Sequence, residues 1–252
     1  PEAQGAISGA LGRELAAYHA RPAGGGVEAA NAAHGLAVEF GATEVRVRAG
    51  RDEWRLALAG YGRGEPSREI APVQPQVAAN RVEYRRGALV EWYVNGPAGL
   101  QQGFTLAEPP GASGGGGASG VLALALRLSG DLQPRWAEGA EGLVLVRADG
   151  QEVLRYRGLV AFDASGRALP AWMELKGQEL WLRVDDGAAR YPVTIDPFIQ
   201  QAKLTASDGA AFDEFGHSVA ISGDTVVVGA YSSDIGANEN QGSAYVFVKP
   251  AG

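Results

Sequence analysis

Short apolar runs with a period of two, separated by turn residues, constrain the fold of this chain more than any other feature. Leu36, Val38 and Phe40 alternate with small or charged residues, and the alternation returns at Val45–Val47 and Trp54–Leu58. A period of two gives a strand one apolar and one polar face. The 37 glycines and 13 prolines supply the turns that many short strands need. We therefore expect an all-β protein of antiparallel sheets.

Alternating runs continue along most of the remaining sequence. Asp149-Gly150, Ser165-Gly166 and Lys176-Gly177 separate several of them, and such pairs favour hairpins because they tolerate a positive φ. Pro192 and Pro197 flank the last run, which we expect to end there. The pattern predicts a β-sandwich-like lead-in domain over residues 34–198, with further strands at 81–85, 89–95, 100–106, 122–129, 143–147, 152–156, 159–163, 171–175, 179–184 and 190–195.

Three segments depart from this pattern. Residues 1–33 are rich in Ala and Gly, and Ile7–Tyr18 has an apolar stripe, which predicts a short helix or a flexible arm. Glycines and prolines at 61–79 predict a connection. Residues 107–120 are either a loop or a domain boundary, and the same strand pattern on both sides favours a loop. Gly114–Gly117 lacks the Lys-Ser/Thr and the helix start of a phosphate-binding loop.

A second group of short runs lies near the C-terminus, at Ser218–Ile221, Thr225–Val228 and Ala244–Val248. They alternate or are β-branched, and Gly, Asp, Asn or Ser bounds each of them. We predict three antiparallel strands within a separate domain over residues 199–252.

The residues of this second group carry a family resemblance. Phe215-Gly216, followed by Gly229-Ala230-Tyr231, resembles the FG-GAP repeat, the blade unit of integrin-type β-propellers, in the compact form of large secreted bacterial proteins. The likeness implies a single blade at about 199–249, with Ile199–Ala206 as the outer strand of the blade before. Residues 34–199 resemble, less specifically, the β-rich region that precedes such repeats. The resemblance implies an extracellular or cell-surface location, although no signal peptide is visible in the chain.

The chain differs from that family in the number of repeats. Propellers close with four to eight blades, whereas one copy is recognisable here. The last strand then exposes backbone donors and acceptors along an edge, which we predict to be Ala244, Tyr245, Val246, Phe247 and Val248. A second copy of the chain, through its N-terminal arm or Ile199–Ala206, would add a strand there and build a filament. If the chain is a piece of a longer propeller, the open edge results from truncation.

These features favour a non-enzymatic structural or adhesive module of a bacterial surface protein, which associates with itself or with other surface proteins. The alternative is a carbohydrate- or ligand-binding β-sandwich with an aromatic platform. Core packing competes with that alternative, because the tryptophans mostly occupy alternating strand positions. The five are Trp54, Trp92, Trp136, Trp172 and Trp181.

Acidic residues in the C-terminal loops raise the question of a metal. Integrin-type blades bind calcium between their first two strands, but the joint Ser222–Thr225 is too short to supply the oxygens that calcium needs. A cation site within Tyr231–Gln241, with Asp234 and Glu239 as ligands, remains the alternative to solvated turn residues. We expect no obligatory cofactor.

Two constellations have the residue types of catalytic sites. His217, Ser218 and Asp224 could suggest a hydrolase triad, but adjacent strand residues point to opposite faces and no nucleophile elbow is present. Asp185-Asp186 could suggest the carboxylate pair of a glycosidase, but the pair precedes Gly187 in a predicted turn. We therefore expect no enzyme.

Charge and composition narrow the partners. The net charge is −7, and no run of Lys or Arg exceeds two residues, so a nucleic-acid partner is not expected. The longest apolar stretch, Val121–Leu126, fits a strand and falls well short of the roughly 18 residues of a membrane span. The absence of cysteine excludes disulfides and thiolate sites.

Overall fold

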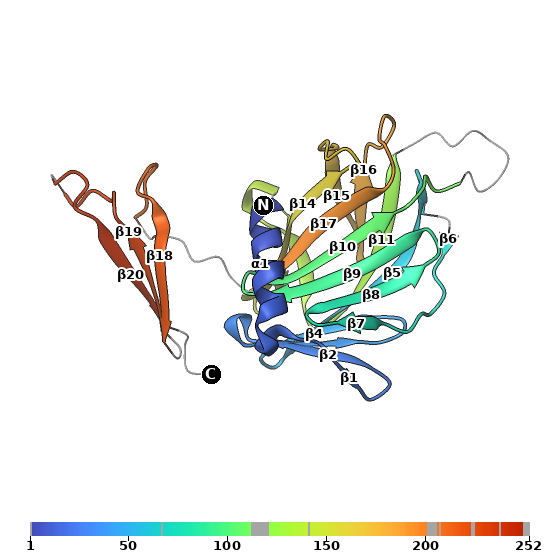
Figure 1. Ribbon diagram of the computed structural model, residues 1–252, viewed down its shortest axis with the longest axis horizontal. Coiled ribbons are helices and arrows are strands. Elements are labelled where there is room, and N and C mark those ends of the chain that lie inside the picture. Colours follow the sequence, from blue (N-terminus) through green and yellow to red (C-terminus); the bar gives the residue numbers. More distant parts are fainter. Residues whose placement is uncertain are drawn as a thin grey trace. The chain divides into compact units, whose positions relative to one another are not determined.

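The computed structural model describes residues 2–66, 68–111, 121–140, 142–200, 206, 208–222, 225–236 and 238–248. The chain divides into two compact units, Pro1–Ala202 and Lys203–Gly252, which we call the lead-in unit and the C-terminal unit. Antiparallel strands dominate both units, which confirms the all-β prediction (Figure 1). In the described part of the chain, no helix is both long and apolar enough to cross a membrane.

One sheet of the lead-in unit, which we call sheet A, contains nine of the described strands. Their order is β1-β2-β3-β4-β5-β11-β16-β15, and β6 pairs with the end of β5. The predicted meander is confirmed, since Val38 lies opposite Val47 and Val47 opposite Trp54. The strands are β1 (Arg21–Ala23), β2 (Gly26–Asn31), β3 (Leu36–Phe40), β4 (Val45–Ala49), β5 (Asp52–Arg63), β6 (Arg68–Glu69), β11 (Leu122–Gly130), β15 (Ala171–Lys176) and β16 (Glu179–Val184).

The second sheet, sheet B, contains eight described strands in the order β12-β13-β14-β17-β10-β9-β8-β7. Two predicted strands, at 152–156 and 159–163, are one strand here, because a register shift between Arg157 and Val160 lets the chain continue. The strands are β7 (Gln76–Ala78), β8 (Arg81–Arg86), β9 (Leu89–Gly96), β10 (Gly99–Leu106), β12 (Gln133–Trp136), β13 (Gly142–Val146), β14 (Glu152–Phe162) and β17 (Val193–Gln200).

The two sheets share one core. Phe40 of sheet A meets Tyr93 of sheet B edge to face, with ring centroids 5.2 Å apart, and Trp54 meets Tyr156 at 6.0 Å. Strands from before and after the glycine-rich segment lie in both sheets, since β5 pairs with β11 and β10 with β17. The segment therefore joins parts of one domain, as expected of a loop, although its residues 112–120 lie outside the described part.

The last strand of the lead-in unit corrects two expectations. We predicted that Pro197 would end the sandwich and that Ile199–Ala206 would belong to a blade. Instead β17 runs through Pro197 to Gln200 and lies between β14 and β10, with Ile199 opposite Leu100. Proline is tolerated because Pro197 has no directly opposed residue on either neighbour. Residues 201–205 lie outside the described part.

The N-terminal segment is folded onto the sandwich and contains a helix, so of the two predicted alternatives the structure shows the helix and not the flexible arm. α1 (Glu2–Glu14) packs against β9, and β1 and β2 extend sheet A. Small residues allow the close approach, because a Cβ at Gly12 would lie only 2.2 Å from the Asn95 carbonyl oxygen. The Ser8 hydroxyl accepts a hydrogen bond from Ala98 N at 3.0 Å.

Buried asparagines hold this junction together. Asn31 donates to Asn95 Oδ1 and to the Gly96 carbonyl, both at 2.8 Å. Asn95 in turn donates to the Tyr18 and Ala30 carbonyls, at 3.0 and 2.8 Å. Because buried polar groups are costly when unpaired, these amides fix the N-terminal segment at one position on the sandwich.

A second buried polar network lies in the core. Glu91 accepts hydrogen bonds from Arg86 and from the Tyr93 hydroxyl, both at 2.8 Å. Gln102 donates to Tyr93 and accepts from Tyr156, each at 2.8 Å. Burial raises the pKa of the Glu91 carboxyl, while the charge of Arg86 opposes that rise. The network ties β8, β9, β10 and β14 together by directional contacts.

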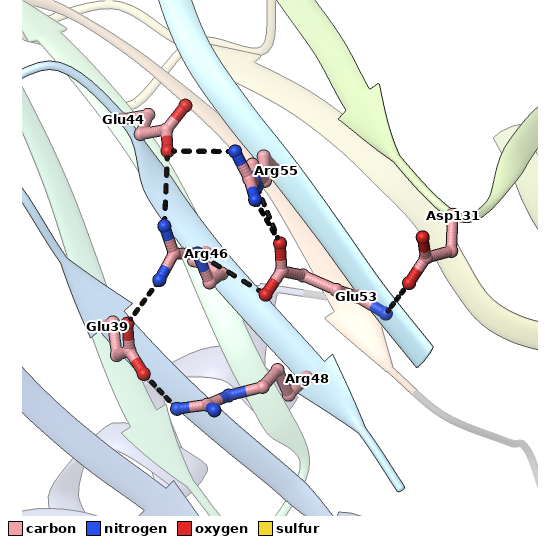
Figure 2. A network of polar contacts seen from close by, with 7 residues as sticks. All are labelled: Glu39, Glu44, Arg46, Arg48, Glu53, Arg55 and Asp131. Atoms are coloured by element: carbon pink, nitrogen blue, oxygen red, sulfur yellow. Dashed lines mark hydrogen bonds and ion pairs between the residues drawn. The ribbon is translucent and has the colours of Figure 1, made fainter. Parts of the chain in front are cut away.

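The outer face of β3, β4 and β5 is charged (Figure 2). Arg46 pairs with Glu39 at 2.8 Å, and Glu44 bridges Arg46 and Arg55 at 3.6 Å each. Such exposed pairs contribute about 0–1 kcal/mol each to stability, so their main effect is to keep this face solvated. The network comprises Glu39, Glu44, Arg46, Arg48, Glu53, Arg55 and Asp131.

The docking of α1 is testable through Gly12. Alanine has the better helix propensity by about 1 kcal/mol, but the clash with Asn95 outweighs it, so Gly12→Ala lowers the free energy of unfolding by about 1–3 kcal/mol. Urea denaturation followed by tryptophan fluorescence measures this, because all five tryptophans lie in the lead-in unit. Leu11→Ala on the same helix, at a side chain 43% exposed, is the control and stays within about 0.5 kcal/mol. Equal stabilities of the two variants would contradict the docked helix.

His34 makes the same junction sensitive to pH. Its Nε2–H donates to the Pro97 carbonyl at 2.8 Å, and burial lowers the pKa of the ring. The folded state therefore resists protonation, and the stability that the neutral ring contributes is present above about pH 6.5 and is lost as the pH falls below it. Between about pH 7.5 and 5.5 the urea midpoint of the natural chain falls more than that of His34→Gln. Parallel changes in both proteins would contradict this.

Candidate interaction edge

The C-terminal unit contains the three predicted strands. They are β18 (Phe215–Ser222), β19 (Thr225–Ala230) and β20 (Ser243–Val248), in the order β18-β19-β20, which confirms the antiparallel arrangement (Figure 1). Ala220 lies opposite Val227, and Val227 lies opposite Val246.

Local geometry explains the glycines of this sheet. Gly216 has φ +95° at a register shift between Phe215 and Ser218, where a side chain would be strained. Gly229 lies under Ser218, because a Cβ there would be 2.4 Å from the Ser218 hydroxyl. Phe215 then reaches across the sheet to Tyr245, with ring centroids 5.2 Å apart.

Both faces of the sheet carry apolar side chains. Directly opposed residues share a face, so Ala220, Val227 and Val246 define one, which we call the Val246 face. Val227 and Val246 are 37% and 62% exposed there. On the opposite face Val228 is buried, whereas Val219 is 57% exposed. Strands with apolar residues on both faces are typical of sheets that are covered on both sides.

The predicted interaction edge is β20. Ala244 to Val248 all belong to this strand, which pairs with β19 and is the terminal strand of the sheet within the described residues. Tyr245 is half-buried and its hydroxyl donates to Asp208 Oδ1 at 2.7 Å. The side chains of Phe247 and Val248 lie outside the described part. The sequence analysis did not identify β18 as the opposite edge, because it assigned Ile199–Ala206 to the blade.

A polar cavity of about 270 Å³ lies in the loops of this unit. Asp234 and Glu239, the predicted metal candidates, both line it, together with Asp208 and Asp213. Asp213 accepts from Ala210 N at 2.8 Å and Asp234 from Asn240 N at 2.7 Å, so these two carboxylates stabilise turns. The described residues hold no group of three or more His, Cys, Asp or Glu side chains arranged for a metal ion. A cation site at Asp234 and Glu239 stays the untested alternative to solvated turn residues.

The residues of the hydrolase-like constellation diverge. The His217 ring meets Tyr231 edge to face at 4.6 Å, while the Ser218 hydroxyl lies over Gly229. Asp224 lies outside the described residues. His217 and Ser218 therefore have different contact partners, Tyr231 and Gly229.

Asp185 and Asp186 have different roles. Asp185 accepts from Gly187 N at 3.2 Å, as expected of a turn. Asp186 is buried instead, and forms a bidentate pair with Arg63 at 2.8 and 2.5 Å and accepts from the Tyr191 hydroxyl. Asp186 also begins the predicted turn, since Ala189 N donates to its carbonyl at 3.0 Å. The sequence analysis missed its buried ion pair, because Arg63 is remote in the sequence.

Comparison with known proteins assigns the C-terminal part. No curated protein matches the chain. Among solved structures, a mutant of a glycoside hydrolase of family 81 from Clostridium thermocellum aligns with 87% of this chain at 10% identity and a TM-score of 0.24. The chain spans 28% of that protein, and so low a score carries no argument. Residues 198–247 match the FG-GAP repeat family, so the resemblance noted in the sequence is confirmed for this part of the chain.

Proposed function

We propose that the chain is a non-enzymatic structural module of an extracellular, bacterial surface assembly, in which the C-terminal sheet serves as a propeller-type blade. FG-GAP repeats are typical of extracellular proteins, and the matched residues 198–247 contain β18, β19 and nearly all of β20. In this proposal the lead-in unit is a stably folded domain with a structural role, and it precedes the blade in the chain.

The observation that carries the proposal is the small core of the C-terminal unit. Among its described apolar side chains only Val228 and Ala230 are buried, whereas Val219, Val227 and Val246 are exposed. Small sheets need a further layer for stability, since a unit this short buries little surface of its own. A partner that covers the Val246 face and pairs with β20 supplies that layer.

The partner that fits best is a second copy of the same sheet. Each copy offers two edges, β18 and β20, in the described part of the sheet. Pairing of β20 with β18 of the next copy can repeat, and it builds a filament when the rotation between copies does not close, whereas pairing of β20 with β20 stops at a dimer. The N-terminal segment and Ile199–Gln200 already belong to the lead-in unit. An edge strand of the second copy therefore takes the place of the two strand donors that the sequence analysis predicted.

Val246→Lys tests this association. A charge on the exposed face beside the edge opposes both face packing and strand addition, while a side chain 62% exposed tolerates lysine in the monomer. The natural chain is expected to form dimers or longer particles as its concentration rises, and the variant to stay monomeric. Light scattering and negative-stain microscopy measure this.

Val219→Lys is the matched control, because Val219 is 57% exposed but lies on β18 and on the opposite face. If β20 pairs with β20 of another copy, this variant still associates. If β20 pairs with β18 of the next copy, as in a filament, this variant also loses association. A natural chain that stays monomeric at high concentration would overturn the proposal.

A further inference from the structure

The tryptophans fall into two groups. Trp54, Trp92 and Trp181 are buried, but only Trp54 belongs to the core cluster, so the prediction of core packing is confirmed for Trp54 alone. Trp172 and Trp136 are 40% and 43% exposed. An exposed indole with oriented polar neighbours is a candidate binding surface, whereas an isolated one is not.

Trp172 has such neighbours on the outer face of β15 and β16. It lies opposite Arg183, and Glu174 lies opposite Trp181, so the four side chains form a two-by-two tile on one face of sheet A. Trp172 Nε1 donates to Glu174 Oε1 at 3.2 Å, and Arg183 donates to both Glu174 oxygens at 3.1 and 3.2 Å. The indole of Trp172 is therefore held in a set orientation.

Trp181 forms the closed half of the tile. Lys176 Nζ lies 3.5 Å from its ring centroid and Arg183 Cζ lies 4.7 Å from it, so two cations cover the ring. The residue beside it on β11 is Ala125, whose small side chain leaves room for the indole to lie on the sheet. Trp172, on the edge strand β15, is the open half.

The polar groups around Trp172 are accessible and balanced in charge. The side chains of Glu174 and Lys176 are 35% and 45% exposed. Burial raises the pKa of the Glu174 carboxyl, but the hydrogen bonds from Trp172 and Arg183 and the nearby cations lower it by more than that. The pKa is therefore lowered overall, and the carboxylate is ionised at neutral pH. The charges around the tile balance, which gives a charged ligand no net attraction; they are Glu65, Glu174 and Glu179 against Arg127, Lys176 and Arg183.

We infer that the Trp172 tile binds a neutral oligosaccharide of pyranose units with equatorial hydroxyls. Such a ring presents a flat face of axial C–H groups that fits the electron-rich face of an indole. Its equatorial hydroxyls point sideways, where the Glu174 carboxylate accepts and the Lys176 ammonium donates hydrogen bonds. A protein partner is less suited, because the apolar area of a single indole is far below that of a stable protein interface.

Titration calorimetry of the full chain with cellohexaose, laminarihexaose and xylohexaose tests this inference. At least one is expected to bind, and Trp172→Ala is expected to weaken that binding at least about tenfold, which corresponds to about 1.4 kcal/mol. Trp172→Phe keeps an aromatic face and retains most of the affinity. Trp136→Ala, at an equally exposed tryptophan on β12 of the other sheet, leaves the affinity unchanged.

Two results would overturn the inference. One is the absence of binding of all three oligosaccharides up to about 10 mM, which is about ten times a weak dissociation constant of about 1 mM. The other is equal affinity of Trp172→Ala and the natural chain. Unchanged urea midpoints of the variants exclude loss of folding as the cause of a loss of binding.

Discussion

A three-stranded sheet pairs the backbone of only its middle strand on both sides. In the C-terminal unit that strand is β19, while β18 and β20 each have one partner within the described residues. Edge amides and carbonyls are satisfied by water in a monomer and by another strand in an assembly, and natural proteins usually protect such edges. The Val246 face adds an apolar surface beside this edge. The proposed association of the unit rests on these two features together.

The lead-in unit covers its apolar faces internally. Its two sheets bury one continuous core, and strands from both halves of the sequence lie side by side in each sheet. Charged pairs on the outer face of β3, β4 and β5 keep that face in water (Figure 2). The lead-in unit therefore has an extensive core of its own, in contrast to the small sheet of the C-terminal unit.

The sequence predicts what is local. Period-two alternation located most strands, and the Phe215-Gly216 signature located the sheet that begins with a bulge at Gly216. The sequence does not state which strands pair at long range, so the position of β17 between β14 and β10 was missed. The sequence analysis ended the strand at Pro197, because proline lacks the N–H that a strand ladder needs. The two strands that leave Pro197 without a directly opposed residue, β10 and β14, are remote in the sequence.

Side-chain roles that depend on remote partners were missed for the same reason. Gly12 weakens an isolated helix. It favours the docked helix only because the Asn95 carbonyl approaches so closely that a Cβ would clash with it. Asp186 has the sequence context of a turn, and only Arg63 makes it a buried ion pair. Among the candidate site residues, Asp234 and Glu239 do share a cavity, since both belong to one loop and local spacing is enough to bring them together.

Hydrogen–deuterium exchange of the β20 amides tests the central claim most directly. The account predicts that amides in Ser243–Val248 exchange more slowly as the protein concentration rises, while those of β19, already paired on both sides, change little. Exchange of β20 that is independent of concentration would contradict it.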